Sequence, residues 1–294
     1  MGTLRKEMEN YMKIKGYSKK TIKLYTSCVK CFSYYFMKSP LDISCNQIEL
    51  FFLYLRNAKK SESTIHIYYE SLKFFYKMNN IKNRLPHITF SKINNKLPEI
   101  LCQNEVFQLL ENCTSLKYRT IFTLIYSAGL RVSEAANLKL SDIDFERKQI
   151  FIRNGKNKKD RYTLLAEETI TLLKKYLQIY NPIECVFYNK DICNNISISC
   201  IQERFKNLVK NSNISKKIHI HTLRHCLATH LLENGTSIFY IMQLLGHSNI
   251  QTTMIYLHMQ SLDKLNIISP IDKYQFDKII DNTNIQQQLF LASA

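Results

Sequence analysis

Apolar residues in the first 80 positions recur every three or four residues, which is the spacing of amphipathic helices. The stretch "YSKKTIKLYTSCVKCFSYYF" shows this spacing at Ile22, Tyr25, Val29, Phe32 and Phe36. The stretches "SCNQIELFFLYLRN" and "SESTIHIYYESLKFFYKMNN" repeat the pattern, and Ser18 and Ser44 stand where an N-cap is expected. We therefore predict a bundle of three or four helices with one shared core in residues 1–85.

The pattern stops between two prolines and then resumes. Residues 86–98, "PHITFSKINNKLP", lack periodicity and are interpreted as a linker. Beyond them, helical spacing returns in several stretches, namely "EVFQLLENC", "KYRTIFTLIYSAG", "VSEAANL" and residues 166–180, 198–211, 222–233 and 237–245. Gln149–Arg153 and Arg161–Leu165 alternate as strands do, and "NGKNKKD" between them has turn chemistry, so we expect a β-hairpin with a basic tip.

These patterns together predict a mainly α protein. A helical bundle (1–85) and a linker (86–98) precede a mixed, mostly helical domain with a small antiparallel sheet (99–270). Residues 271–294 form a C-terminal tail.

Charge indicates the class of partner. The 294-residue chain has a formal net charge of +17, and residues 1–95 carry 17 basic and 6 acidic residues. The predicted outer faces of the first helices carry lysines: Lys19, Lys20, Lys23, Lys59, Lys60, Lys73 and Lys77. Such a surface attracts a polyanion, and nucleic acid is favoured over an acidic membrane because no amphipathic anchor or lipidation motif is present. With no apolar run near ~20 residues and no signal segment at the start, the expected location is the cytoplasm, at the nucleoid.

Residue types suited to phosphate chemistry gather in the second half. They follow in the order Arg131, Lys156, His221, Arg224, His247 and Tyr256. Two arginines can fork onto phosphate oxygens, and histidines can donate hydrogen bonds or move protons near neutral pH. A lysine can protonate a leaving oxygen, and a tyrosine can form a covalent intermediate if its environment activates it.

A metal site is the competing interpretation of the same histidines. His225 and His230 share the predicted helix of His221, but His–carboxylate spacings such as HExxH do not occur. Cys28 and Cys31 form a lone CxxC pair without a second pair at zinc-site spacing. We therefore expect no metal, and cysteines that remain thiols.

Four stretches, in this order, resemble the catalytic boxes of tyrosine recombinases, the phage integrase family: "GLRVSEAANLKLSDID", "NGKNKKDRYTLL", "HTLRHCLATHLLENG" and "LGHSNIQTTMIYLHM". The helical first half is similar to the family's SAM-like core-binding domain. The resemblance covers roughly residues 10–260, and the size and layout are most similar to Xer-type recombinases and small mobile-element integrases.

The resemblance implies six catalytic residues, Arg131, Lys156, His221, Arg224, His247 and Tyr256. The two arginines would clamp the scissile phosphate, and the two histidines would assist through hydrogen bonding and proton transfer. The lysine would be the general acid for the departing 5′-hydroxyl. Tyr256 would be the nucleophile and form a 3′-phosphotyrosyl bond. No metal and no other cofactor is implied.

The resemblance also implies partners. Two rounds of strand exchange would pass through a Holliday junction between two double-stranded DNA recombination sites. The protein would act as a homotetramer, or as a heterotetramer with a paralogue, in integration, excision or chromosome dimer resolution. The segment 271–294 would either dock on a neighbouring subunit or form a disordered tail.

Several alternatives stay open at this stage. Lys158 and Lys159 compete with Lys156 as general acid, because the hairpin has asparagine where the family often has a second glycine. Glu134 is a candidate for supporting an active-site arginine. The alternative functions are strand relaxation of the type IB topoisomerase kind and a catalytically inactive DNA-binding relative.

Overall fold

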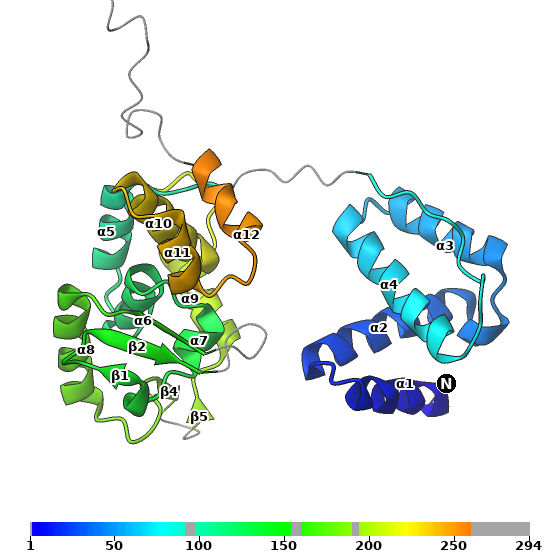
Figure 1. Cartoon of the computed structure of the whole chain (residues 1–294), viewed down its shortest axis with the longest axis horizontal. Helices are drawn as coiled ribbons and strands as arrows, with labels where there is room; N and C mark the ends of the chain where they lie inside the picture. Colours follow the sequence, from blue (N-terminus) through cyan, green and yellow to red (C-terminus); the bar gives the residue numbers. More distant parts are fainter. Residues whose placement is uncertain (1, 92–97, 154–159, 190–193, 260–294) are drawn as a thin grey trace, which may run out of the picture. The chain divides into compact units, whose positions relative to one another are not determined.

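The computed structural model describes residues 2–91, 98–153, 160–189 and 194–259 (Figure 1). The chain divides into two compact units, Met1–Lys96 and Leu97–Ala294. Both consist mainly of helices, and the second adds short antiparallel strands, so the predicted fold class is confirmed. The hairpin tip with its three lysines, the middle of the predicted linker and the tail 271–294 lie outside the described residues.

The first unit contains four α-helices and one 3₁₀ turn within its described residues. They are α1 (Gly2–Ile14), α2 (Lys19–Phe36), η1 (Pro40–Asp42), α3 (Cys45–Asn57) and α4 (Glu62–Met78). α2 packs on α1 and α4, and α3 packs on α4, around a core rich in phenylalanine. In that core Phe51 makes edge-on contacts with Phe32 and Tyr68.

The helix starts in this unit follow the predicted capping chemistry. Ser18 precedes α2, and its hydroxyl accepts a hydrogen bond from the Thr21 amide at 3.1 Å. Ser44 and Gln47 form a reciprocal capping box at the start of α3. Each cap satisfies amide donors that the first helical turn leaves unpaired, so these serines define where the helices begin.

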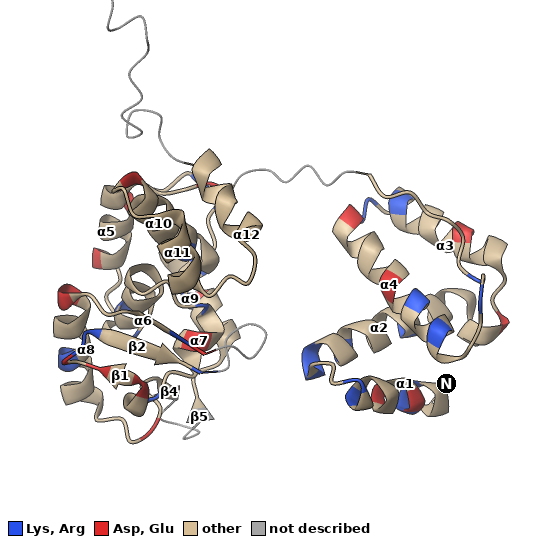
Figure 2. Ribbon diagram, in the orientation of Figure 1, with Lys and Arg blue, Asp and Glu red and all other residues tan. Residues whose placement is uncertain are grey.

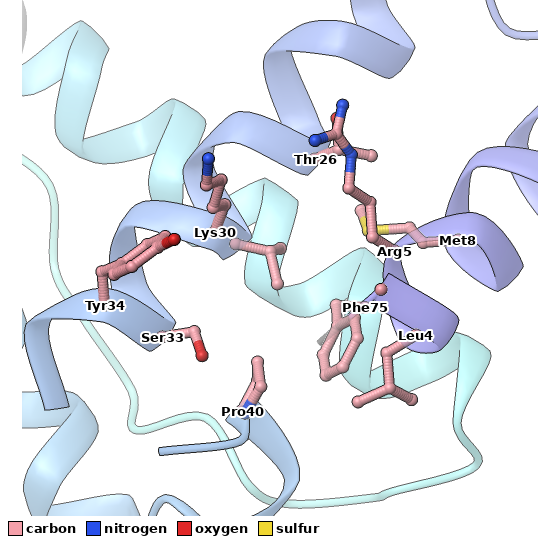
Figure 3. Close-up of a pocket in the computed structure, with 11 residues that line it drawn as sticks. Leu4, Arg5, Met8, Thr26, Lys30, Ser33, Tyr34, Pro40 and Phe75 are labelled. Carbon is pink, nitrogen blue, oxygen red and sulfur yellow. The ribbon is translucent and has the colours of Figure 1, made fainter. Parts of the chain in front are cut away.

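A cavity of about 190 Å³ lies between α1, α2 and α4, next to η1 (Figure 3). Its wall is largely apolar, with Leu4, Met8, Pro40 and Phe75 among the lining residues. The polar groups around it have partners: Thr26 donates to the Ile22 carbonyl, Ser33 to the Lys38 carbonyl, and Arg5 pairs with Glu9. The polar groups of Thr26, Ser33 and Arg5 are therefore already engaged within the protein.

Basic residues lie on all four helices of the first unit, more than one each on α1, α2 and α4 and Arg56 alone on α3 (Figure 2). The seven lysines predicted on the outer faces, between Lys19 and Lys77, are all exposed. Few carboxylates lie near them, and Lys73 with Glu70 at 3.8 Å is a loose surface pair. The first unit therefore presents a positive surface that salt would screen.

The second unit is built around one large core, formed by helices and the inner face of a sheet. Its α-helices are α5 (Gln103–Glu111), α6 (Leu116–Ser127), α7 (Val132–Ala136), α8 (Glu167–Tyr180), α9 (Ile198–Lys210), α10 (Ile220–Glu233), α11 (Ile238–Leu245) and α12 (Gln251–Met254). Two 3₁₀ turns, η2 (Leu140–Asp142) and η4 (Ile255–His258), complete the described helical elements. α6 packs against α8, α9 and α10, which places it at the centre of the unit.

The sheet has three antiparallel strands in the order β1 (Ile143–Asp144), β2 (Gln149–Ile152) and β3 (Arg161–Leu164). The predicted hairpin is present, in a register that pairs Gln149 with Leu164 and Ile152 with Arg161. The third strand and a separate ribbon of β4 (Tyr188–Asn189) and β5 (Asn194–Asn195) were not predicted, because two-residue strands are too short to show alternation.

The β3 end of the hairpin lies against α11. β3 contacts α11, and Arg161, the first residue of β3, donates a 2.9 Å hydrogen bond to the Leu244 carbonyl near the end of α11.

Among the described helices, none is long and apolar enough to cross a membrane.

Candidate active site

Four separate segments of the second unit meet at an open cavity of about 260 Å³. The segments are the start of α7, the first turns of α10, the turn after α11 and the continuous stretch of α12 and η4; α7, α10, α11 and α12 are labelled in Figure 1. The cavity is lined by Arg131, His221, Arg224, His225, Gly246, His247, Ser248, Thr252, Ile255 and Tyr256. Five of the six residues singled out from the sequence therefore line one cavity, and the sixth, Lys156, lies outside the described residues.

Arg224 links the turn before α7 to the end of α11 through hydrogen bonds. Its side chain is buried, and its guanidinium donates to the carbonyls of Gly129, before α7, and of Leu245, at the end of α11. Gly129 has φ +63°, and a Cβ there would lie 2.9 Å from a methyl group of Leu245. A glycine at this position lets the α6–α7 turn approach α11 closely enough for one arginine to bind both. Burial, and then the nearby Arg131, lower the pKa of Arg224 to about 9, so it stays charged at neutral pH.

Glu134 is the acidic group around which the arginines are arranged. Its two oxygens accept hydrogen bonds from Arg161 at 2.9 and 2.8 Å, and Oε1 also accepts from Arg131 Nη1 at 2.6 Å. Arg224 Nη1 lies 4.0 Å from Oε2. Burial alone would raise the pKa of Glu134, but the hydrogen bonds and charge of Arg161, and then of Arg131, lower it to about 2. One carboxylate among three guanidinium groups leaves a net positive charge beside the cavity.

The turn after α11 places His247. α11 ends at Gly246, which has φ +63°, and the amide of His247 bonds back to the Met242 carbonyl at 3.0 Å. A Cβ on Gly246 would lie 2.7 Å from Cδ of Arg161. In this position His247 Nδ1 lies 2.9 Å from Thr253 Oγ1 and its Nε2 lies 3.4 Å from Arg224 Nη2.

Tyr256 lies on η4 with its ring buried at 1% exposure. Its hydroxyl is 3.1 Å from His225 Nδ1, and its ring stacks on His247 with a centroid separation of 6.4 Å. Burial raises the pKa of Tyr256, and Arg224 and Arg131 act in the opposite direction. The hydroxyl is therefore protonated at neutral pH, in a position where positive charge would favour its ionised form.

The remaining histidine of the pattern, His221, lies in the first turn of α10 and lines the same cavity while staying open to solvent. The pKa of His221 is lowered, first by partial burial of the ring and then by Arg224 and Arg131. At neutral pH it is therefore mostly uncharged and able both to donate and to accept a hydrogen bond.

Sequence reasoning missed two residues of the site, His225 and Arg161. His225 had been considered only as a metal ligand, although its spacing of four residues from His221 places both on one face of a helix. For Arg161 the sequence pattern predicts only a place in a strand, and nothing local in the sequence connects it with Glu134. His230 lies elsewhere on the buried side of α10, 2.9 Å from both the Tyr126 hydroxyl and the Leu101 carbonyl.

Comparison with known proteins identifies the family. The sequence profile described as "Phage integrase family" matches residues 99–262, and that described as "Phage integrase, N-terminal SAM-like domain" matches residues 4–80. The chain belongs to the phage integrase family of tyrosine recombinases. The family inferred from the four sequence motifs is thereby confirmed, as is the SAM-like nature of the first unit.

Several relatives span nearly the whole of this tyrosine recombinase. A tyrosine recombinase from Thermosipho africanus is 34% identical over 273 residues, which is 88% of this chain and 95% of the relative. XerA from Pyrococcus horikoshii is 29% identical over 277 residues, 90% of this chain and 94% of the relative. The crystal structure of XerH bound to palindromic difH substrate, a post-cleavage complex, matches with a TM-score of 0.68 at 25% identity, covering 82% of this chain and 76% of that one.

Gly246→Ala tests whether Arg161 fills the space beside the turn after α11. Gly235→Ala is a matched control, because Gly235 also has a positive φ, +83°, but a Cβ there would meet nothing within 4 Å. Each change places alanine in a left-handed backbone conformation, at a cost of roughly 1–2 kcal/mol. In the recombinase we expect Gly246→Ala to lower the free energy of unfolding, measured in urea, by at least about 1 kcal/mol more than Gly235→Ala. Equal losses would show that Arg161 moves aside freely.

Glu134→Gln should destabilise the recombinase at pH 7, because three guanidinium groups would then surround an uncharged amide. The pKa of Glu134 falls from 4.5 to about 2 in the folded state, so the carboxylate contributes on the order of 3 kcal/mol above pH 4.5. Since the folded-state pKa is lowered, this contribution is lost as the pH falls from 4.5 towards 2. Urea unfolding should show the gap to wild type narrowing from about pH 5 to about pH 3.

Glu184→Gln is the control for that comparison. Glu184 also pairs with a base, Lys139, at 2.6 Å, but its side chain is 71% exposed. Exposed pairs of this kind contribute little to stability, so Glu184→Gln should change the unfolding free energy far less. A pH-independent effect of Glu134→Gln would contradict the assigned ionisation.

Proposed function

We propose that this recombinase cuts and rejoins DNA strands at specific sites, with Tyr256 as the nucleophile. The observation that supports this most directly is the convergence of Tyr256, Arg131, Arg224 and His247 on one cavity with a net positive charge. Burial raises the pKa of Tyr256, and Arg224 and Arg131 lie close enough to the tyrosine to oppose that rise. A phosphodiester carries the negative charge that such a cavity would bind.

In the proposed reaction the phosphodiester lies between the tyrosine and the arginines. Arg131 and Arg224 donate hydrogen bonds to the non-bridging oxygens and stabilise the charge that builds up as phosphorus becomes pentavalent. His221 and His247, which line the same cavity, donate further hydrogen bonds. Each such donor is typically worth about 10²–10³ in rate.

The covalent step exchanges one bond for another. The Oη–P bond to Tyr256 forms, and the P–O5′ bond breaks, which leaves a 3′-phosphotyrosyl enzyme and a 5′-hydroxyl. We propose Lys156 as the general acid that protonates the departing O5′. A 5′-hydroxyl from a second strand reverses the step and completes an exchange, and two rounds of exchange give recombination through a Holliday junction. Because the phosphotyrosyl bond conserves the energy of the phosphodiester, the reaction needs no ATP.

The proposed assembly places several copies on DNA. The related XerH structure holds a palindromic difH substrate, and a lambda integrase structure holds a dimer on a core site. We propose that this chain binds double-stranded recombination sites at the nucleoid in the cytoplasm, as a tetramer of one chain or with a paralogue. Residues 1–85 would contact the DNA, and so would residues 99–270, which hold the catalytic residues. Residues 271–294, outside the described residues, would dock on a neighbouring subunit.

Covalent trapping tests the nucleophile. Duplex sites selected by the full-length protein from a randomised pool would be nicked next to the cleavage position. The short fragment that carries the new 5′-hydroxyl then diffuses away, and the covalent complex accumulates. Wild type should form a protein–DNA adduct that survives denaturing electrophoresis. Tyr256→Phe should form none while binding the duplex normally, since it lacks only the attacking oxygen. An adduct with Tyr256→Phe would exclude Tyr256 as the nucleophile.

The same sites, unnicked, distinguish the candidate activities. Two differently labelled duplexes should yield recombinant strands with wild type. Relaxation of supercoiled DNA without exchange between duplexes would instead indicate a topoisomerase, and binding without any adduct would indicate an inactive relative.

Lys156→Ala tests the general acid. A 5′-bridging phosphorothiolate leaves without protonation, so this substrate should restore cleavage by Lys156→Ala to within about tenfold of wild type, against a loss of about 10²–10⁴ on the ordinary phosphodiester. Lys158→Ala and Lys159→Ala are matched controls on the same hairpin. If either of them, rather than Lys156→Ala, shows the loss and the rescue, the general acid is that lysine.

A further inference from the structure

His225 lies against the reactive atom of the proposed nucleophile. Its Nδ1 is 3.1 Å from the hydroxyl oxygen of Tyr256, and the two rings are 5.7 Å apart between centroids. This is hydrogen-bond distance to the one proton that Tyr256 must lose before or during attack.

The surroundings of His225 keep its imidazole neutral. Facing it are His221 and Arg224 from its own helix, Arg131 from the start of α7, His247 from the turn after α11, and Tyr256 from η4. Burial lowers the pKa of His225, and the positive charges of His221 and Arg224 lower it further. A neutral imidazole has one nitrogen with a free lone pair. The buried hydroxyl of Tyr256 is protonated, so it can donate to that nitrogen.

The other histidine in contact with the tyrosine ring is engaged differently. His247 stacks on the ring, while its Nδ1 lies against Thr253 and its Nε2 against Arg224. It is placed to donate towards a phosphate oxygen beside Arg224. The two histidines therefore have different positions: His247 lies beside Arg224, where a phosphate would bind, and His225 lies against the hydroxyl of Tyr256.

We propose that His225 is the general base of the cleavage step, a role that rests on the proposed function of Tyr256. As Tyr256 Oη bonds to phosphorus and O5′ departs, the hydroxyl proton passes to Nδ1 of His225, and the general acid supplies a separate proton to O5′. In rejoining, the imidazolium returns its proton to Tyr256 as the 5′-hydroxyl displaces it. No oxidant, metal or further reactant enters, and the residue ends each cycle neutral.

Timing of the proton transfer follows from the two groups. Tyrosine, with an ordinary pKa of 10.0, holds its proton more tightly than histidine, with an ordinary pKa of 6.5. Burial raises the first pKa and lowers the second, which moves them further apart. Transfer before attack is therefore unfavourable, and the proton moves as negative charge passes from the oxygen to phosphorus. The resting enzyme consequently keeps its nucleophile protonated until a phosphate is bound.

The test uses single-turnover formation of the covalent adduct by the full-length protein on the nicked duplex, between about pH 5 and pH 8. His225→Asn puts an amide close to the position of Nδ1, so it can keep the contact with Tyr256 but cannot take up the proton. We expect adduct formation to slow by about 10²–10⁴, the usual contribution of a general base. Because burial and the nearby positive charges lower the pKa of His225, the wild-type rate should fall only towards the acid end of this range, and His225→Asn should lose this acid limb.

His221→Asn is the matched comparison, because it removes a histidine from the same cavity one turn earlier on the same helix. It should slow the reaction but keep the acid limb. Added imidazole should raise the rate of His225→Ala, where the removed ring leaves space beside Tyr256, and should not raise that of His221→Ala. DNA binding and thermal unfolding of each variant establish that it is folded. If His225→Asn does not fold, His225→Gln takes its place.

The possible outcomes separate the two proposals. Loss of the acid limb with imidazole rescue supports His225 as the base. A rate near wild type for His225→Asn, or a slow variant that keeps the acid limb and is not rescued, overturns it and leaves His225 as a residue that only positions Tyr256. If wild type forms no adduct while Tyr256→Phe binds the same DNA equally well, the proposed function itself fails.

Discussion

The ion cluster on Glu134 is the constraint on which the candidate active site depends. Arg131, Arg161 and Arg224 surround this one carboxylate, and two of them have side chains that are less than a tenth exposed. Buried guanidinium groups are costly unless they are paired and hydrogen-bonded. Glu134 and the carbonyls of two turns supply that pairing, yet the total charge stays positive. The cavity can therefore attract a phosphate without leaving isolated buried charges in the DNA-free protein.

The same cluster ties together parts of the chain that are distant in sequence. Arg161 begins the second strand of the hairpin that carries the proposed general acid, and it contacts both Glu134 and the end of α11. Arg224 holds the turns at Gly129 and Leu245. Both turns need glycine, at Gly129 and Gly246, because side chains of the neighbouring segments occupy the space where a Cβ would stand. The geometry of the cavity is thus set by close backbone approaches as much as by the charged groups themselves.

Protonation is controlled by burial in the same cavity. Tyr256 has a raised pKa, and His221 and His225 have lowered ones, so the resting site holds a neutral phenol among neutral imidazoles and charged arginines. A nucleophile in this state is unreactive in the absence of substrate. Arg131 and Arg224 oppose the effect of burial on Tyr256, so the two cations proposed to bind the phosphate also favour the ionised form of the nucleophile.

The sequence by itself determined the helical architecture, the hairpin, the caps at Ser18 and Ser44, and the family, because periodicity, turn residues and ordered motifs are local properties. It also singled out Tyr256, although nothing near that residue distinguishes it from the other tyrosines of the chain. Only the tertiary structure decided which groups touch it. The contact of His225 with Tyr256 joins residues 31 positions apart, and the bonds of Arg161 to Glu134 join residues 27 apart. Such contacts depend on how α7, α10, η4 and the sheet pack, and packing between separate segments leaves no periodic signal in the chain.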